Sequence, residues 1–217
     1  MKSILVVGIG RFGYHLIDQL NKAGDEILAV DSSEERIEPV LGMVTSSLIG
    51  DATNESFVRS LGVENFDVCF VAIGDDFQAS LETTSLLKEC GARYVVARAS
   101  RSVHEKFLLR NGADAVVFPE KQLAEWAAIR WCSGRVLDYL DYPGEFSIFE
   151  IKVPKSWIGK NLAELGIRNK LHLNVLSIKR EGKQILEFPA EFVFEEGDTV
   201  TIFGADKDIR KSLNLNY

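Results

Sequence analysis

Cysteine, long apolar runs and basic charge are all scarce in this 217-residue sequence. The three cysteines are widely spaced and form no Cys-x-x-Cys pair, which argues against a disulfide framework or a zinc site and favours a reducing cytoplasm. No apolar stretch approaches the roughly 20 residues of a membrane-spanning helix, so we expect no direct insertion into a membrane. The net charge of −7 argues against nucleic acid as a partner, because phosphate backbones attract basic surfaces.

The composition itself is that of a soluble globular protein, with 46% hydrophobic and 26% charged residues. From residue 3 to residue 118, short apolar runs alternate with segments that have apolar residues at helical spacing. The expected strands are 3–9, 26–31, 46–50, 68–74, 94–99 and 115–118, and the expected helices are 12–23, 33–41, 54–61, 77–90 and 103–111. This alternation predicts an α/β fold with a doubly wound, Rossmann-like parallel sheet of six strands.

The next segment starts at Glu120 as a helix rich in large apolar residues and breaks at Gly134, which predicts a crossover helix. Its Leu123, Trp126 and Ile129 are spaced three apart and form one stripe, while Trp131 points away from that stripe. The stripe packs on its own domain or takes part in an oligomer contact, and the sequence leaves both alternatives open.

Beyond Pro143-Gly144 the pattern is mostly β. Turns at Glu181-Gly182 and Glu196-Gly197 predict two hairpins in a small α+β lobe. We therefore expect three parts: the Rossmann domain with its crossover helix over 1–133, a linker over 134–144, and the C-terminal lobe over 145–217.

A glycine loop follows the first expected strand and opens the first expected helix. Gly8, Gly10 and Gly13 have the G-x-G-x-x-G spacing that admits a tight turn, a close approach of a pyrophosphate, and close helix packing. Asp31 follows Gly13 by 18 residues, near the position of the acid that binds ribose hydroxyls. These residues predict a dinucleotide or nucleotide site, and the carboxylate disfavours NADP.

Further candidates lie at the ends of other expected strands. Arg11 can reach a phosphate or remain in solvent at the helix start. Asp51 can bind a base or ribose edge, or form a turn before the next helix. Arg98 can face the same crevice, and the position of Glu120 is also explained by a helix N-terminus, which favours carboxylates.

Catalytic residues are not evident. His15, His104 and His172 have no evident carboxylate partner, and the sequence contains neither G-x-S-x-G nor H-E-x-x-H. We therefore expect sensing rather than catalysis, and no enzyme activity. The alternatives are an NAD-dependent oxidoreductase that uses the same crevice, and a scaffold that binds no nucleotide.

Several motifs together resemble RCK domains, most closely the KtrA/TrkA-type regulators of bacterial potassium uptake. The motifs are VVGIGRFG, VD after the second strand, GDAT, VAIG, ARA and GADAVVFPE. The resemblance covers the whole chain and implies a cytoplasmic regulatory subunit, peripheral to the inner face of the membrane. It implies homodimers that assemble into a homo-octameric ring beneath a membrane-embedded K⁺ channel subunit, whose K⁺ flux the ring controls by ATP/ADP exchange.

The resemblance also implies ligands and contact residues. ATP or ADP, or NAD or NADH, would occupy the N-terminal crevice, with Arg11 on the terminal phosphate of ATP and Asp31 on ribose. Glu120 would help to place a divalent cation, Mg²⁺ or Ca²⁺, beside the γ-phosphate. The implied nucleotide contacts are Gly8, Gly10, Arg11, Phe12, Gly13, Asp31, Ser32, Asp51, Ala52, Ala72, Ile73, Gly74 and Arg98. A candidate cyclic di-AMP site in the C-terminal lobe comprises Ile167, Arg168, Asn174 and Pro189.

Two departures from the family pattern bear on ligand preference. Ser32-Ser33 stands where relatives often carry an asparagine, which can alter ribose and base recognition. Asp75-Asp76 follows the fourth strand, where added negative charge weakens phosphate binding unless a cation offsets it.

Overall fold

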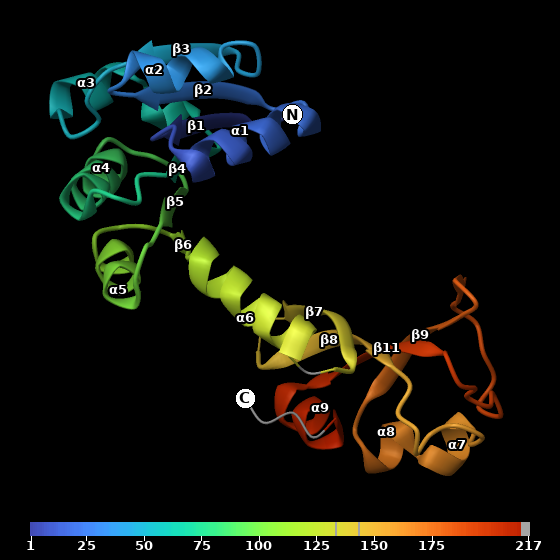
Figure 1. Cartoon of the computed structure of the whole chain (residues 1–217). Helices are drawn as coiled ribbons and strands as arrows, with labels where there is room; N and C mark the ends of the chain where they lie inside the picture. The colour runs from blue at the N-terminus through green and yellow to red at the C-terminus, as the bar shows by residue number, and fades with distance from the viewer. Residues whose placement is uncertain (133, 143, 214–217) are drawn as a thin grey trace. The chain divides into compact units, whose positions relative to one another are not determined.

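The computed structural model shown in Figure 1 describes residues 1–132, 134–142 and 144–213. The predicted domain boundary at Ser133, the Pro143 of the predicted break and the end of the C-terminal lobe after Leu213 lie outside the described residues. Contacts divide the chain into two compact units, Met1–Lys121 and Gln122–Tyr217. Each unit is described by itself.

The first unit is an α/β domain built on a six-stranded parallel sheet. The strand order β3-β2-β1-β4-β5-β6 confirms the doubly wound, Rossmann-like fold. The strands are β1 Ser3–Val7, β2 Glu26–Asp31, β3 Ser46–Ile49, β4 Val68–Val71, β5 Val95–Arg98 and β6 Ala115–Val117. The helices are α1 Arg11–Ala23, α2 Glu34–Ile37, α3 Glu55–Ser60, α4 Phe77–Glu89 and α5 Ser102–Arg110, with 3-10 turns η1 Glu38–Val40 and η2 Val63–Asn65.

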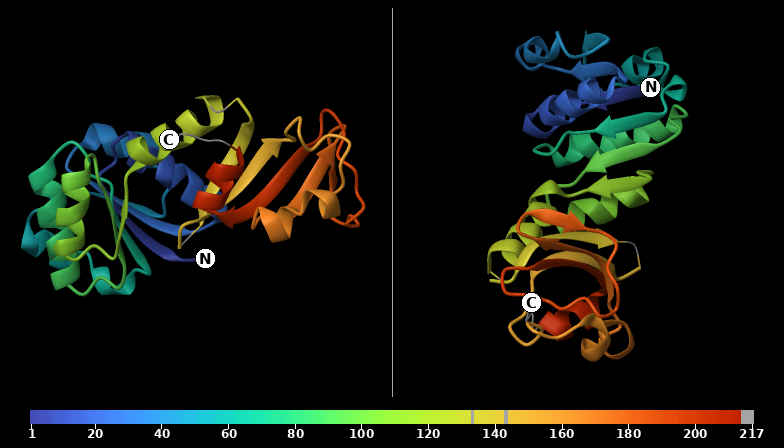
Figure 2. Two further views of the ribbon diagram at one scale, coloured as in Figure 1. Left: turned by 90° about the horizontal axis from the view of Figure 1, so that it is seen from below. Right: turned by 90° about the vertical axis from the view of Figure 1, so that its right-hand side faces the viewer.

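Helices cover both faces of this sheet (Figure 2), as the apolar residues of β1 require. Ile4 and Val6 join one core with Ile17 of α1 and residues of α2, and the intervening Leu5 and Val7 join the other core with residues of α3, α4 and α5. Because successive side chains of a strand point to opposite faces, a strand that is apolar at every position needs a cover on each side.

The second unit contains a five-stranded antiparallel sheet in the order β10-β9-β11-β8-β7. Its strands are β7 Val136–Tyr142, β8 Phe146–Lys152, β9 Asn174–Arg180, β10 Lys183–Ile185 and β11 Thr199–Ala205. Helices α7 Leu162–Leu165, α8 Ile167–Lys170 and α9 Asp206–Leu213 complete the α+β lobe, and α6, Pro119–Cys132, enters it from the first unit. Its core includes Trp157, Phe194 and Ile202. No helix in the described part of the chain combines the length and apolarity that crossing a bilayer requires.

Parts of the second unit differ from the sequence prediction. The segment 134–144, expected to be a linker, contains β7, which pairs along β8 and gains its backbone hydrogen bonds there. The first predicted hairpin is present as β9 and β10, but the second is not: β11 instead pairs with β8 and β9. The residues before Glu196-Gly197 form an isolated bridge, Asn161 with Val193, rather than a strand.

Some large apolar side chains of α6 are packed and others are exposed. Ile129 is buried in the core of the second unit, and the Trp126 indole donates a 2.9 Å hydrogen bond to Asp138. Leu123 and Trp131 are 63% and 72% exposed. The end of the stripe therefore packs in the core of the second unit, whereas the sequence prediction placed this helix with the Rossmann domain.

Candidate functional site

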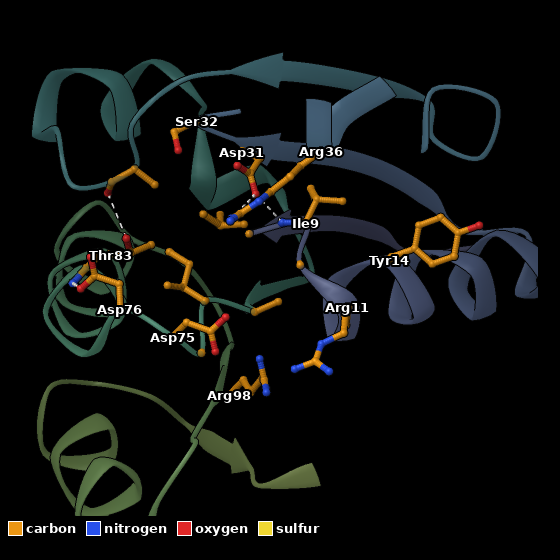
Figure 3. Close-up of a pocket in the computed structure, with 18 of the residues that line it drawn as sticks. Ile9, Arg11, Tyr14, Asp31, Ser32, Arg36, Asp75, Asp76, Thr83 and Arg98 are labelled. Atoms are coloured by element: carbon orange, nitrogen blue, oxygen red, sulfur yellow. Dashed lines mark hydrogen bonds and ion pairs between the residues drawn. The ribbon is translucent and has the colours of Figure 1, made fainter. Parts of the chain in front are cut away.

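A cavity of about 930 Å³ opens at the carboxyl ends of the parallel strands. It lies where the strand order reverses between β1 and β4, the usual position of ligands in open α/β sheets. Figure 3 shows its lining side chains. The strand ends contribute Val7, Gly8, Ile9, Gly10, Arg11, Asp31, Ser32, Gly50, Asp51, Ala52, Thr53, Ala72, Ile73, Gly74, Asp75, Asp76 and Arg98. The volume falls within the range of small-molecule and cofactor sites.

Two glycines at the start of α1, Gly10 at its N-cap and Gly13 in its first turn, have different surroundings. A Cβ at Gly13 would collide with the carbonyl oxygen of Gly8, so close packing inside the protein requires this glycine. A Cβ at Gly10 would meet nothing within 4 Å. Gly10 is also the N-cap of α1 and makes no side-chain hydrogen bond to the first turn, which leaves backbone N–H groups available to an anion. A phosphate group fits this open cradle.

Asp31 fastens the glycine loop to the end of β2. Its buried carboxylate accepts hydrogen bonds from the Ile9 N–H at 2.6 Å and the Ser33 N–H at 2.9 Å. The guanidinium of Arg36, in α2, lies 3.7 Å from the Asp31 carboxylate (Figure 3). Asp31 is therefore engaged with backbone on both oxygens, while each oxygen keeps a lone pair for a further donor such as a ribose hydroxyl.

Two other acidic groups of the cavity, Asp51 and Asp76, accept hydrogen bonds within local turns. Asp51 accepts hydrogen bonds from the backbone N–H and from the hydroxyl of Thr53. The backbone hydrogen bond, followed by the hydroxyl one, holds the pKa of the Asp51 carboxyl below its usual value. Asp76 caps α4 by accepting from the Ala79 N–H at 2.9 Å. The turn alternative for Asp51 is thus present in the structure, at a position that also lines the cavity.

Arg98, from the end of β5, lines the cavity (Figure 3). Its Nη2 donates to Glu120 Oε1 at 2.5 Å, and its guanidinium lies 5.8 Å from the centre of the Phe12 ring. Gly74 allows this arrangement, because a Cβ there would collide with the guanidinium. The Arg98 Nε is buried and has no hydrogen-bond partner among the described residues.

Glu120 lies in the first turn of α6, as its sequence position indicates. Burial raises the pKa of its carboxyl, but three favourable effects outweigh it: its own backbone N–H, the hydrogen bond and charge of Arg98, and the charge of Arg11. Their sum holds the Glu120 pKa below its usual value. No group of three His, Cys, Asp or Glu side chains arranged to hold a metal ion occurs within the described ranges. A cation at Glu120 would therefore need oxygens from a ligand.

Most of the predicted nucleotide contacts line this one cavity. The exceptions are Phe12, which packs under Arg98, and Gly13, which packs against Gly8. Besides the residues at the strand ends, sequence reasoning missed seven lining residues: Tyr14, His15, Glu35, Arg36, Pro39, Ala79 and Thr83. Helical spacing from Arg11 could have identified Tyr14 and His15, which lie three and four positions further along α1.

The predicted cyclic di-AMP residues differ in their exposure. Ile167 is buried in the core, whereas Arg168, Asn174 and Pro189 are exposed. None of the four lines the cavity at the strand ends or the shallow hollow around Gly144 and Asp206.

The histidines have packing or surface positions, apart from His15 at the cavity edge. His104 is fully buried against Phe77, and its Nδ1 accepts from the Ser100 N–H at 3.4 Å. Burial, followed by the charges of Arg101 and Arg98, lowers the His104 pKa. This ring is therefore neutral at neutral pH.

The chain is similar to known protein domains and to known proteins over nearly its full length. Residues 4–119 match the TrkA-N domain and residues 146–215 match the TrkA-C domain. The Ktr system potassium uptake protein C of Bacillus subtilis (strain 168) is 37% identical over 97% of this chain and 95% of its own length. Ktr system potassium uptake protein A of the same organism is 36% identical over 98% of this chain and 96% of its own length.

Solved structures show the same fold. The GsuK channel bound to NAD aligns with a TM-score of 0.66 at 19% identity, over 95% of this chain and 38% of that one. The crystal structure of the GsuK RCK domain aligns with the same score and identity, over 99% of this chain and 47% of that one. This chain thus spans less than half of either of these solved chains. The NAD(P)-binding domain of an exopolyphosphatase-related protein from Archaeoglobus fulgidus is 29% identical over 58% of this chain, with a TM-score of 0.52.

Proposed function

The chain belongs to the family that joins a TrkA-N to a TrkA-C domain, the family of the Ktr potassium uptake proteins, and from this membership we propose that it is a nucleotide-sensing regulatory subunit of a K⁺ transport system. Two relatives that align with this chain over 95% and 96% of their own length are named as parts of that system. We propose that the protein is not an enzyme, and that it acts on a separate membrane-embedded channel subunit.

The single observation that carries nucleotide binding is the open cradle at Gly10 beside two arginines that line the same cavity, Arg11 and Arg98. Both side chains extend toward the same part of the pocket in Figure 3. Fixed guanidinium donors and free helix N–H groups are the partners that phosphates take in proteins. We assign the phosphates of ATP or ADP to this end and the ribose to Asp31.

The same cavity admits NAD or NADH, because its volume and its glycine loop also suit a dinucleotide. Two solved relatives of the fold are described as bound to NAD and to ADP. Titration with ATP, ADP and NADH distinguishes these ligands.

Glu120 fits a divalent cation only together with the oxygens of a phosphate. A bound Mg²⁺ or Ca²⁺ would offset the negative charge that Asp75 and the phosphates bring together. Arg11, at the start of α1, supplies a donor for a third phosphate that ADP does not carry. A ligand shifts a two-state protein only by binding its two states with different affinity. ATP makes contacts that ADP lacks, and we propose that through these contacts the two nucleotides favour different states.

We further propose that dimers of the chain assemble into an octameric ring on the cytoplasmic side of the membrane, held there by the channel subunit. Support comes from the family membership and from exposed apolar side chains of α6, Leu123 and Trp131. Binding of cyclic di-AMP to the C-terminal lobe stays a prediction from the resemblance alone.

The test is calorimetric titration of the nucleotide-free protein with ATP, ADP and NADH, with and without Mg²⁺ or Ca²⁺. We expect ATP and ADP to bind and a divalent cation to strengthen ATP alone. The change Arg11→Ala should weaken ATP roughly ten- to hundred-fold, the value of a hydrogen bond to a charged group, and leave ADP nearly unchanged.

Arg59→Ala is the matched control, because Arg59 is exposed, pairs with Glu55 on α3 and does not line the cavity. It should leave both affinities unchanged. An unaltered ATP/ADP preference in the Arg11 variant would overturn the proposed role of Arg11. Binding of NADH alone, with oxidation of NADH by an added substrate, would establish the oxidoreductase instead.

A further inference from the structure

The lining of the cavity extends beyond the strand ends and the glycine loop. Several lining residues come from elements that cover one face of the sheet: Tyr14 and His15 from α1, Glu35 and Arg36 from α2, and Pro39 from η1. These elements pack together there, since Ile17, Ile37 and Val40 belong to one core. The cavity thus reaches past the end of β2, where we place the ribose, toward α2.

Arg36 brings a positive charge to this part of the cavity. Its side chain extends from α2 toward the end of β2 and is 60% exposed (Figure 3). Among the described residues, the only polar partner of its guanidinium is the Asp31 carboxylate, at 3.7 Å, which is longer than a hydrogen bond. A guanidinium carries five N–H donors in a fixed fork, so Arg36 has donors for an anion that enters the cavity.

A carboxylate at the position of Asp31 disfavours a phosphate on the ribose, as in NADP, but the folded chain offsets its charge. The Asp31 side chain is only 3% exposed, and its two oxygens accept hydrogen bonds from the backbone N–H groups of Ile9 and Ser33. These bonds and the charge of Arg36 stabilise the carboxylate inside the protein. Glu35 is exposed, and solvent screens its charge. The charge that this end of the cavity presents to a ligand is therefore mainly that of Arg36.

The pair of Asp31 and Arg36 suits a ribose that has one free and one phosphorylated ring hydroxyl. The free hydroxyl can donate to a lone pair of the Asp31 carboxylate, and the phosphate can accept from the N–H groups of Arg36. In dinucleotide-binding α/β folds, an arginine near the acid at the ribose accommodates a phosphate on the 2′ oxygen. The exposed fork of Arg36 has the chemistry for that contact.

We propose that Arg36 forms a second anion subsite, which takes a phosphate on the 2′ or 3′ oxygen of the ribose. The ligand class is a nucleotide that carries phosphate both at the 5′ position and on a ring hydroxyl of the same ribose. This inference rests on the proposed function, since it assumes that the 5′-phosphates lie at Gly10 and the ribose at Asp31.

The test is displacement of bound ADP from the full-length protein by three ligands that share adenosine 5′-phosphate: AMP, adenosine 2′,5′-bisphosphate and adenosine 3′,5′-bisphosphate. We expect one bisphosphate to displace ADP at a concentration roughly three- to ten-fold lower than AMP, as a charge-assisted hydrogen bond at a partly exposed site would give. The stronger bisphosphate identifies the ribose oxygen that carries the phosphate.

Arg36→Ala should remove this preference, because the added phosphate then meets Asp31 without a cation beside it. Arg36→Lys keeps the charge without the fork and should retain part of the preference. Arg59→Ala is the matched control, since the Arg59 side chain is also 60% exposed and pairs with Glu55 outside the cavity. It should keep the full preference. Thermal unfolding without ligand checks that each variant is folded.

AMP serves as the internal reference, because a general defect of the cavity weakens all three ligands by the same factor. Equal weakening of that kind in Arg36→Ala overturns the inference, as does a bisphosphate preference that survives in this variant. Displacement by both bisphosphates no better than by AMP in the unaltered protein also overturns it, and leaves the proposed function standing. Failure of ADP itself to bind overturns the proposed function.

Discussion

Two glycines of the G-x-G-x-x-G motif, Gly10 and Gly13, serve different purposes. Gly13 is needed by the fold, because any side chain there would meet the Gly8 carbonyl oxygen. Gly10 has an extended backbone that any residue can adopt, and open space where a side chain would stand. The fold gives no reason for glycine at this second position, whereas the close approach of a phosphate does.

We therefore predict opposite effects for two alanine substitutions. Gly13→Ala should lower the free energy of unfolding by about 1–3 kcal/mol through overpacking, even though alanine favours helices. Gly10→Ala should change it by less than about 0.5 kcal/mol and yet abolish most ADP binding, because the methyl group fills the cradle. Denaturant unfolding and ADP titration measure the two effects.

Each variant is the control for the other. Gly13→Ala tests the contribution of glycine to stability, and Gly10→Ala tests its contribution to ADP binding. If Gly10→Ala bound ADP as tightly as the unaltered protein, the phosphate would have to lie elsewhere in the cavity.

At the scale of elements, one arginine holds a long segment without regular structure against the sheet of the second unit. Arg180, the last residue of β9, binds Asp198 through Nε and Nη2, Glu195 through Nη1 and the Val193 carbonyl through Nη2. Its guanidinium also lies 4.7 Å from the Phe192 ring centre. These contacts fix the end of segment 186–198, which runs from β10 to β11.

Asp198 gives this anchor a dependence on pH. Burial raises the Asp198 pKa. The hydrogen bond from Arg180, the hydrogen bond from the Glu195 N–H and the charge of Arg180 lower it by more, so the folded pKa lies below the usual value. A carboxyl with a depressed folded pKa stabilises the protein above its unfolded pKa, near 3.9, and this stability is lost as the pH falls through the folded value.

We predict that Asp198→Asn lowers the free energy of unfolding of the second unit on the order of 3 kcal/mol at pH 7, because it leaves Arg180 without its buried partner. The difference between variant and unaltered protein should shrink as the pH falls below about 4. Glu191→Gln, an exposed residue of the same segment, should have no comparable effect. A loss of stability that did not change with pH would contradict this role of Asp198.

At the scale of the whole molecule, the chain consists of two units, each with its own hydrophobic core. All three tryptophans, Trp126, Trp131 and Trp157, belong to the second unit, whereas the candidate nucleotide site belongs to the first. Tryptophan fluorescence therefore follows the second unit alone, and far-UV circular dichroism follows both.

We predict that ADP at about 100 times its Kd stabilises the first unit by about 2.7 kcal/mol, since it binds only the folded site. Circular dichroism should show this as an unfolding transition that moves to higher denaturant, while the fluorescence transition moves less. ADP with the Gly10→Ala variant is the control and should move neither. Equal shifts in both signals would mean that the two units unfold together.

The sequence by itself determined the N-terminal fold and the position of the candidate site. Short, nearly continuous apolar runs and the helices between them are local patterns. The rule that ligands lie at the carboxyl ends of parallel strands places one cavity at the ends of these runs. The strand order and the cavity at the ends of β1 to β5 agree with that prediction. The family resemblance, drawn from motifs such as GIGRFG and GDAT, is confirmed by the domain matches.

Only the tertiary structure decided which partners the charged side chains take. Arg98 and Glu120 are 22 residues apart, and Asp31 binds the N–H of Ile9 across the same separation. β7 and the pairing of β11 with β8 and β9 also depend on strands distant in the chain. Such contacts are chosen by the packing of the whole unit and leave no periodic trace in the sequence, so the ion pair of Arg98 with Glu120 became visible only in the folded protein.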